Sequence, residues 1–191
     1  MLVIWSLNFV VSKIALRHFE PNLLACLRVA FSALFGLPIL FWEMRLERFA
    51  MTGRDTVLLY IMGVFGVVGN QFVFTLGISR TTIAHAAIMA ATFPMLTLIV
   101  ARLMGQESIT RGKVIGMSLA TLGVATLQFG REGTSSGVGP SLLGDLLIFS
   151  SAILLAVSTV AGKPVARRHT PGLVISIGYL SGALTLAPYT W

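Results

Sequence analysis

The chain is poor in charged residues and in cysteine. Of its 191 residues only 11% are Asp, Glu, Lys or Arg, less than half of the roughly 25% typical of a soluble domain. A chain that is 55% hydrophobic has too little polar surface to cover a water-soluble fold. The single cysteine, Cys26, excludes an internal disulfide. With no second thiol or histidine near it in sequence, we predict a small apolar packing residue there and no metal site.

Acidic residues are the scarcer of the two charge types. The 14 Lys and Arg against 7 Asp and Glu give a net charge of +7, which in a soluble protein would suggest a nucleic-acid partner. Here the charges lie between apolar runs, the pattern of basic loops that face the anionic inner leaflet of a membrane. The distribution therefore predicts the lipid bilayer as a partner and no nucleic acid.

Long apolar runs are abundant. Residues 81–101, between Arg80 and Arg102, are 21 residues without an acid, Lys or Arg. As a helix this segment is about 31 Å long, close to the roughly 30 Å of a bilayer's hydrocarbon core. Seven such runs occur, at residues 1–16, 21–42, 56–76, 83–101, 114–129, 142–162 and 172–189. Because runs this long without strict alternation exclude barrel strands, the predicted fold class is all-α, a polytopic transmembrane helix bundle.

The positions of Lys and Arg predict how the bundle is oriented. If each run crosses the membrane once, nine Lys and Arg lie in the loops after the second, fourth and sixth runs, and four in the loops after the first, third and fifth. Positive charge collects on the cytoplasmic side. We therefore expect a multi-pass protein of the cell (inner) membrane with a cytoplasmic N-terminus.

The start of the chain is repeated 150 residues later. The matched pairs are Val10/Val160, Lys13/Lys163, Arg17/Arg167, Pro21/Pro171, Leu23/Leu173, Ala33/Ala183, Leu34/Leu184 and Pro38/Pro188. Five runs, an odd number, precede the second copy, so it enters the membrane from the opposite side, as in the inverted repeats of many secondary transporters. The predicted organisation is a five-helix repeat at 1–127, a Gly/Ser-rich linker at 128–141, and the first two helices of a second, inverted repeat at 142–191.

Four segments carry a family resemblance. NFVVSKIALRHFEP, LRVAFSALFGLPIL, GISRTTIAHAAIMAATFPMLTLIVARLMGQE and GKVIGMSLATLGVATL together resemble the EamA family of the drug/metabolite transporter superfamily. The resemblance implies a ten-helix inner-membrane carrier with both termini cytoplasmic, many members of which export amino acids or other metabolites. About seven of the ten helices are present, so we expect a C-terminally truncated member.

Four polar side chains are predicted to share one layer of the bundle. Asn8 and Arg28 each lie ten residues from His18, where the first two runs turn back, and so lie at equal depth. Asn70 and Gln71 fall in the same layer. An Arg within a span is costly and suggests function, and Arg28 resembles an Arg that the family often carries in its second helix. The hypothesis is a central cavity for a polar or anionic substrate group. The alternative is that Arg28 reaches the interface or is neutralised by backbone carbonyls.

Three further residues are candidates for the substrate pathway. His85, near the outer end of the fourth run, is titratable near neutral pH; it is interpreted either as a proton-coupling group or as an interfacial histidine without a role. Pro94 in mid-span frees a backbone carbonyl and predicts a kink that acts as a hinge or lines a cavity. Trp5 is expected either to stack on substrate or to contact lipid.

Other residues are predicted to be structural. Glu107 and Arg111 are four residues apart in the hinge after the fourth run, which predicts an ion pair. Asp145, at the start of the sixth run, is expected to cap that helix. A further set of small residues is spaced to line one helix face, which predicts close packing either within the subunit or in a homodimer: Gly112, Gly116, Ala120 and Gly123.

Three function classes stay open on the sequence alone. The leading prediction is a secondary transporter that exports a small polar metabolite by alternating access. A non-transporting truncated remnant or scaffold is the alternative. A polytopic membrane enzyme is disfavoured because no HExxH, paired intramembrane Asp, phosphate loop or Cys/His pair is found. Accordingly, no catalytic residue, metal or cofactor is predicted.

Overall fold

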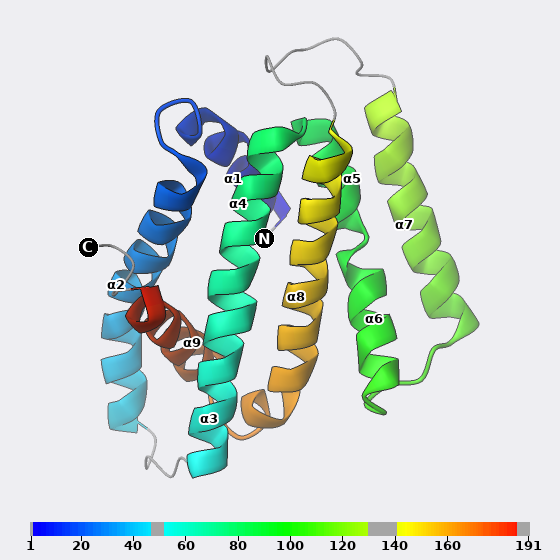
Figure 1. The fold of residues 1–191 in the computed structure, drawn as a ribbon. Helices are drawn as coiled ribbons and strands as arrows, with labels where there is room; N and C mark the ends of the chain where they lie inside the picture. The colour runs from blue at the N-terminus through cyan, green and yellow to red at the C-terminus, as the bar shows by residue number, and fades with distance from the viewer. Residues whose placement is uncertain (1, 47–51, 130–140, 187–191) are drawn as a thin grey trace.

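The computed structural model describes residues 2–46, 52–129 and 141–186, and every regular element in those ranges is a helix (Figure 1). The all-α fold class is therefore confirmed. In chain order the elements are α1 (Leu2–Ala15), α2 (Pro21–Leu46), α3 (Gly53–Ile61), the π-helix η1 (Met62–Gly69), α4 (Asn70–Arg80), α5 (Ile83–Ala91), α6 (Phe93–Leu103), α7 (Arg111–Phe129), α8 (Leu142–Ala166) and α9 (Pro171–Leu186).

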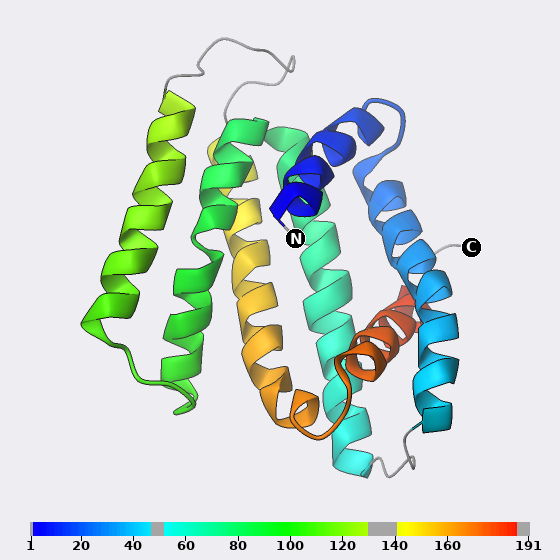
Figure 2. The same ribbon diagram turned by 180° about the vertical axis from the view of Figure 1, so that it is seen from behind.

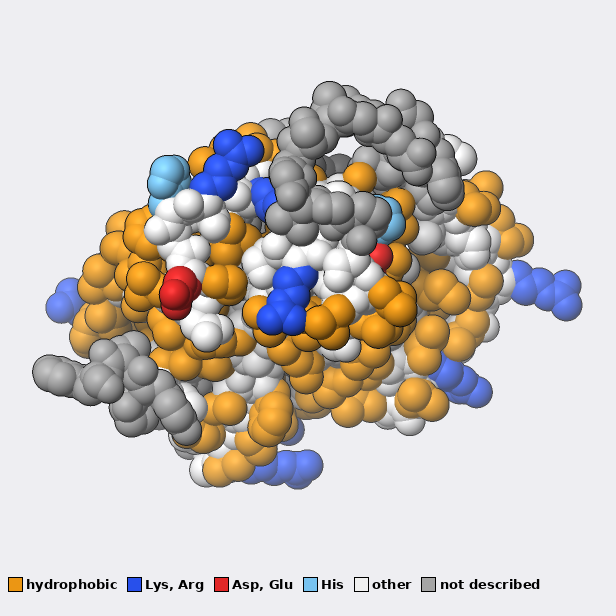
Figure 3. Space-filling model, turned by 45° about the horizontal axis from the view of Figure 1, so that its top comes forward, with side chains coloured by type: hydrophobic (Ala, Val, Ile, Leu, Met, Phe, Trp, Pro, Cys, Tyr) orange, Lys and Arg blue, Asp and Glu red, His pale blue; other side chains and the backbone are white. Residues whose placement is uncertain are grey.

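Four helical stretches in the described residues are long and apolar enough to cross a membrane: Pro21–Arg45, Gly53–Arg80, Ile83–Leu103 and Leu142–Ala166. Of the other predicted spans, α1 and α9 are shorter, at 14 and 16 residues. Large apolar side chains such as Phe35 and Trp42 are mostly exposed, and hydrophobic atoms cover much of the surface seen in Figure 3. An apolar exterior of this extent belongs to a multi-pass membrane protein.

The third span is longer than predicted and is not a plain α-helix. α3, η1 and α4 follow one another without a break from Gly53 to Arg80, and the amide of Asn70 donates to the carbonyl of Phe65, five residues earlier. Such π segments are rare and occur most often at functional positions. Asn70 and Gln71, both predicted to be functional, directly follow this one.

The fourth span is interrupted near Pro94. α5 ends at Ala91 and α6 begins at Phe93, with Thr92 between them. The proline lies in the first turn of α6, where its missing amide costs no intrahelical bond. The expected kink is thus a break between two short helices.

The third span and α8 pack closely against each other. α4 and α8 lie side by side and run in opposite directions (Figures 1 and 2). A Cβ atom at Gly77 would lie 2.9 Å from the side chain of Ile148, and one at Gly144 would lie 2.9 Å from the carbonyl oxygen of Arg80. Small residues of this kind let helices approach closely in lipid. α9 packs on the other side of the third span, between η1 and α2.

The two lysines matched by the repeat lie at opposite ends of the bundle. Lys13 contacts the C-terminal end of α4, whereas Lys163 contacts the hinge between α6 and α7, and these two points are at opposite ends of α8 in Figure 1. An inverted repeat requires this placement. The domain boundaries stay a prediction, and most of the proposed linker lies outside the described residues.

Candidate functional site

Arg28 is the centre of a polar cluster between the first two helices. Its Nη2 donates to Oδ1 of Asn8 at 2.8 Å and its Nη1 donates to Oγ of Ser12 at 2.7 Å. Asn8 and Ser12 are one turn apart on α1, so both can face one side chain of α2. The equal depth predicted for Asn8 and Arg28 thus corresponds to a direct hydrogen bond. Ser12 was missed because a lone serine in an apolar run carries no distinctive signal.

Phe74 of α4 completes the surroundings of the guanidinium. The Arg28 Cζ atom lies 5.9 Å from the centroid of the Phe74 ring, within the range of a cation–π contact. Phe74 in turn makes an edge-on contact with Phe9 of α1, with ring centroids 5.5 Å apart. The aromatic pair therefore places the Arg28 cluster against the second half of the third span.

Asn70 and Gln71 separate in the structure. The side-chain amide of Asn70 donates to the carbonyl oxygen of Ser151 at 2.8 Å, so Asn70 ties α4 to α8 and makes no hydrogen bond with Arg28. Gln71 is half-buried, and among the described residues its side chain has no hydrogen bond. Neighbouring residues on a helix point about 100° apart, so the two amides face different partners. The hypothesis of four residues lining one cavity stays a proposal for Asn8, Arg28 and Gln71.

Two further pathway candidates are Pro94 and Trp5. Pro94 is exposed at the break in the fourth span. Trp5 lies on α1, but its side chain is outside the described residues.

Lys13 is a buried residue that sequence reasoning did not single out as functional. Its Nζ donates to the carbonyl oxygens of Ile78 at 2.7 Å and Thr81 at 2.6 Å, and only 7% of the residue is exposed. A cation at the C-terminal end of a helix satisfies carbonyls that have no intrahelical partner. Lys13 thus fixes α1 to α4, and its match with Lys163 was the available signal.

His85 and Asp145 form a tie at the same end of the bundle. The His85 Nδ1 lies 2.8 Å from Asp145 Oδ2, and the Thr81 hydroxyl donates to Asp145 Oδ1 at 2.5 Å. Asp145 lies in the first turn of α8, as the helix-dipole argument predicted, but it is not the N-cap: that residue is Ser141, whose side chain accepts from the amide of Gly144. Asp145 instead joins α8 to the start of α5, and His85 has a defined partner.

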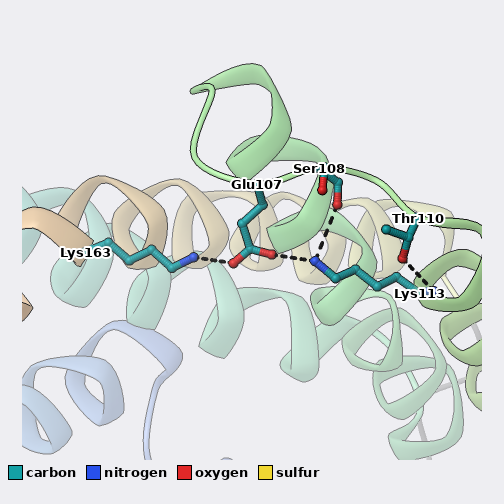
Figure 4. A network of polar contacts seen from close by, with 5 residues as sticks. All are labelled: Glu107, Ser108, Thr110, Lys113 and Lys163. Atoms are coloured by element: carbon teal, nitrogen blue, oxygen red, sulfur yellow. Dashed lines mark hydrogen bonds and ion pairs between the residues drawn. The ribbon is translucent and has the colours of Figure 1, made fainter.

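Glu107 bridges two lysines at the opposite end (Figure 4). Its carboxylate accepts from Lys163 Nζ at 2.5 Å and from Lys113 Nζ at 3.0 Å. These hydrogen bonds, first that of Lys163 and then that of Lys113, lower the pKa of Glu107 from 4.5 to about 2. The predicted pairing with Arg111 is wrong among the described residues: the hinge bends so that Lys113, on the next turn, meets the carboxylate. Glu107 thus joins the hinge after α6 to α8, and its structural role stays a prediction.

The small-residue face of α7 is open. A Cβ atom added at Gly112, Gly116 or Gly123 would meet nothing within 4 Å. The described residues therefore do not provide the predicted packing within the subunit at these three glycines, although α7 does contact α5 and α6. Packing against a second subunit stays a prediction. The described residues also hold no group of three or more His, Cys, Asp and Glu placed to bind a metal ion.

Comparison with known proteins identifies the family to which the chain belongs. Residues 1–128 match the model of the EamA-like transporter family. The chain belongs to the EamA-like transporter family. The family resemblance predicted for this EamA-like chain is therefore confirmed. No solved structure matches it.

Its relatives are longer proteins. An uncharacterized transporter of Archaeoglobus fulgidus is 25% identical over 185 residues, which are 97% of this chain and 63% of the relative. The uncharacterized transporter YyaM of Bacillus subtilis is 25% identical over 94% of this chain and 58% of its own length. A probable amino-acid metabolite efflux pump of Salmonella typhimurium is 26% identical over 99% of this chain and 60% of its own length. The chain spans about 60% of the length of these relatives.

Proposed function

We propose that the protein is a secondary transporter of the cell membrane that exports amino acids or other small polar metabolites by alternating access. The observation that carries this proposal is the cluster of Arg28, Asn8 and Ser12 within the bundle. Polar and charged side chains inside membrane spans mark substrate pathways, and a half-buried arginine bound by two neutral acceptors is suited to receive a polar solute. The relatives named as efflux pumps support the direction of transport.

Two features of the backbone support alternating access. The third span contains a π-helix and the fourth is broken at Thr92, and discontinuous helices form the midplane sites of many secondary transporters. The opposite placement of Lys13 and Lys163 supports two inverted halves that rock against each other. Side-chain ties join the halves at both ends of α8, through Asp145 and through Glu107, and a rocking motion must break them in turn.

The proposed orientation places the N-terminus in the cytoplasm. The basis is the excess of Lys and Arg in the loops after the second, fourth and sixth apolar runs, since positive charge collects on the cytoplasmic side. Single cysteines at Arg102 and His18, introduced in a Cys26→Ser background, test it in intact cells. A membrane-impermeant maleimide should label the cysteine at position 18 and not the one at 102; the reverse pattern would invert the topology.

The transport proposal is tested in proteoliposomes that contain the intact protein. Efflux of radiolabelled amino acids and hydroxy acids should occur with the wild-type protein and fall at least tenfold with Arg28→Ala, because a charge-assisted hydrogen bond contributes about 1.5–3 kcal/mol. Arg80→Ala is the matched control, since Arg80 is an exposed arginine at the end of α4. Normal transport by a correctly inserted Arg28→Ala variant would contradict the assigned site.

A further inference from the structure

The end of α8 contains a weak point at Pro164. This proline lies in the last turn of the helix, which ends at Ala166. Proline has no amide hydrogen, so the carbonyl of Val160, four residues earlier, loses its intrahelical donor. The side-chain Nε2 of Gln106, in the hinge after α6, donates to that carbonyl oxygen at 3.1 Å. A side chain from another element therefore replaces the missing bond, and α8 can bend at this turn.

The hinge after α6 holds this turn through two consecutive residues. Gln106 binds Val160, and Glu107 binds Lys163 (Figure 4). Val160 and Lys163 are three residues apart and so share one face of α8. Gly105, which precedes Gln106, has a φ of 67°, a left-handed conformation that ends α6 and that glycine adopts without strain. The end of α6 thus positions both side chains at the weak turn of α8.

Two further acids hold the turn between α8 and α9. The Asp55 carboxylate, in the first turn of α3, lies 3.3 Å from Nη1 of Arg168 and 3.7 Å from Nε2 of His169. The Glu43 carboxylate of α2 accepts from the hydroxyl of Thr170 at 2.6 Å. Three consecutive residues of the turn are therefore bound to acids of α2 and α3.

A buried apolar cluster lies one helical turn inside these contacts. It contains Leu59 of α3, Val165 of α8 and Val174 of α9, none more than 8% exposed. Leu59 is four residues after Asp55, and Val174 is four residues after Thr170, so each lies one turn further along the chain than the contact that precedes it. Moving the turn between α8 and α9 away from α3 would expose this cluster to water.

The contacts at this end of α8 are of a kind that can break and re-form. The side chains of Glu107 and Lys163 are 35% and 36% exposed, and that of Arg168 is 59% exposed. Ion pairs that water reaches contribute little individually. The other end of α8 is held differently: a Cβ atom at Gly144 would lie 2.9 Å from the carbonyl oxygen of Arg80, so the backbones of α8 and α4 meet there. We therefore expect the C-terminal end of α8, rather than its N-terminal end, to move.

We propose that residues 164–170, the end of α8 and its turn toward α9, form a gate that pivots at Pro164 and is closed in this structure. The side chains that close the gate come from α2, α3 and the hinge after α6: Glu43, Asp55, Gln106 and Glu107. This inference rests on the proposed function and deepens it to the control of access. The gate lies at the membrane face that the charge distribution assigns to the cytoplasm, and it opens to that face when these side chains release it.

Cysteine accessibility in the purified, detergent-solubilised intact protein is the test, because it does not depend on transport. Val174→Cys, in the Cys26→Ser background, is reacted with a charged methanethiosulfonate reagent, which modifies only thiols that water reaches. Adding Glu107→Gln should speed labelling about 1.5-fold to fivefold, the range for one exposed ion pair. Adding Asp55→Asn as well should speed it about twofold to 25-fold in total, because the two acids share no partner.

The matched control is a cysteine at the opposite end of the bundle. Ala86 of α5 is fully buried in a cluster with Ile78 and Ile148. Labelling of Ala86→Cys should be slow, and Glu107→Gln and Asp55→Asn should leave its rate unchanged, because the gate lies at the other end of α8. A general loosening of the protein would speed the labelling of both cysteines.

Pro164→Ala tests the pivot. The alanine supplies an amide for the Val160 carbonyl, so the end of α8 should be more stable and open less often. The variant should raise the unfolding temperature, slow the labelling of Val174→Cys about twofold to tenfold, and slow efflux from proteoliposomes. Pro21→Ala is the matched control: Pro21 is the first residue of α2, where a missing amide costs no intrahelical bond, so labelling and efflux should stay unchanged.

Three results would each overturn the gate. These are unchanged labelling of Val174→Cys in the variant that lacks both acids, equal acceleration of Ala86→Cys, and a Pro164→Ala variant that is more stable but reacts at the original rate. The proposed function fails separately. Labelling that depends on the gate, with no efflux by the wild-type protein, would refute transport and leave the gate intact. Efflux with labelling that ignores the gate variants would refute the gate alone.

Discussion

The crossing of α9 over the π-helix permits a quantitative prediction. At Gly63, the Cβ atom of an alanine would overlap the Oγ atom of Ser181 and would lie 2.5 Å from the carbonyl oxygen of Gly178. Because the Gly178 carbonyl belongs to the backbone, a change of the Ser181 rotamer alone does not make room, and α9 has to move. Overpacking of this kind costs about 1–3 kcal/mol.

Gly53→Ala is the matched control on the same span. A Cβ atom at Gly53 would meet nothing within 4 Å. Replacing Gly by Ala at a compatible position stabilises a protein by about 0.4–1 kcal/mol through the unfolded chain, and this gain applies to both variants and largely cancels. Gly63→Ala should therefore be less stable than Gly53→Ala by about 1–3 kcal/mol.

Thermal unfolding in detergent, followed by circular dichroism at 222 nm, measures the difference. For a protein of this size it corresponds to an unfolding temperature about 2–12 °C lower for Gly63→Ala. The comparison uses a single detergent and protein concentration. Equal unfolding temperatures would refute the close crossing of α9 over residues 62–69.

Three further predictions concern single side chains. Asn70→Ala should lower the free energy of unfolding by about 0.6 kcal/mol, the average for a hydrogen bond between membrane helices. Gln71→Ala should leave the free energy of unfolding unchanged and weaken transport. The opposite pattern would show that Asn70 is not the tie to α8 and that Gln71 is not part of the substrate site. Lys13→Met should destabilise by about 1.5–3 kcal/mol because two charge-assisted bonds are lost, while exposed Lys113→Met should have little effect on thermal unfolding. The pKa of Glu107 falls from 4.5 to about 2 on folding, so between these pH values the unfolded state binds more protons than the folded state. The stabilising effect of the Glu107 carboxylate is therefore complete above pH 4.5 and is lost as the pH falls toward 2. Glu107→Gln should remove that acid-limb dependence in unfolding measured against pH.

Hydropathy predicted the helical class and most of the spans, and counting residues from the turn at His18 predicted that Asn8 and Arg28 lie at equal depth. These features follow from apolar run length and from equal spacing about a turn, which are local properties of the sequence. The break near Pro94 was predictable for the same reason, because the proline removes its donor wherever the residue lies.

The misassigned residues depend on tertiary geometry. Glu107 has Arg111 at the spacing of one helical turn, but the hinge is not helical there, and Lys163 reaches it from a segment 56 residues away. Asp145 lies four residues after the cap Ser141, and its carboxylate contacts His85 of α5. No local pattern distinguishes such partners, since they arise only once the helices pack.

The π-helix determines which side chains the rest of the third span presents inward. Its amide ladder reaches back five residues, so the segment from 62 to 69 turns the chain less per residue than an α-helix does. Deleting one residue there to restore α-helical bonding would rotate everything after it by about 100°. Phe74 would then lose its contact with the guanidinium of Arg28, and Asn70 would lose its hydrogen bond to the Ser151 carbonyl. The winding of the backbone therefore decides which partners these side chains meet as much as their identity does.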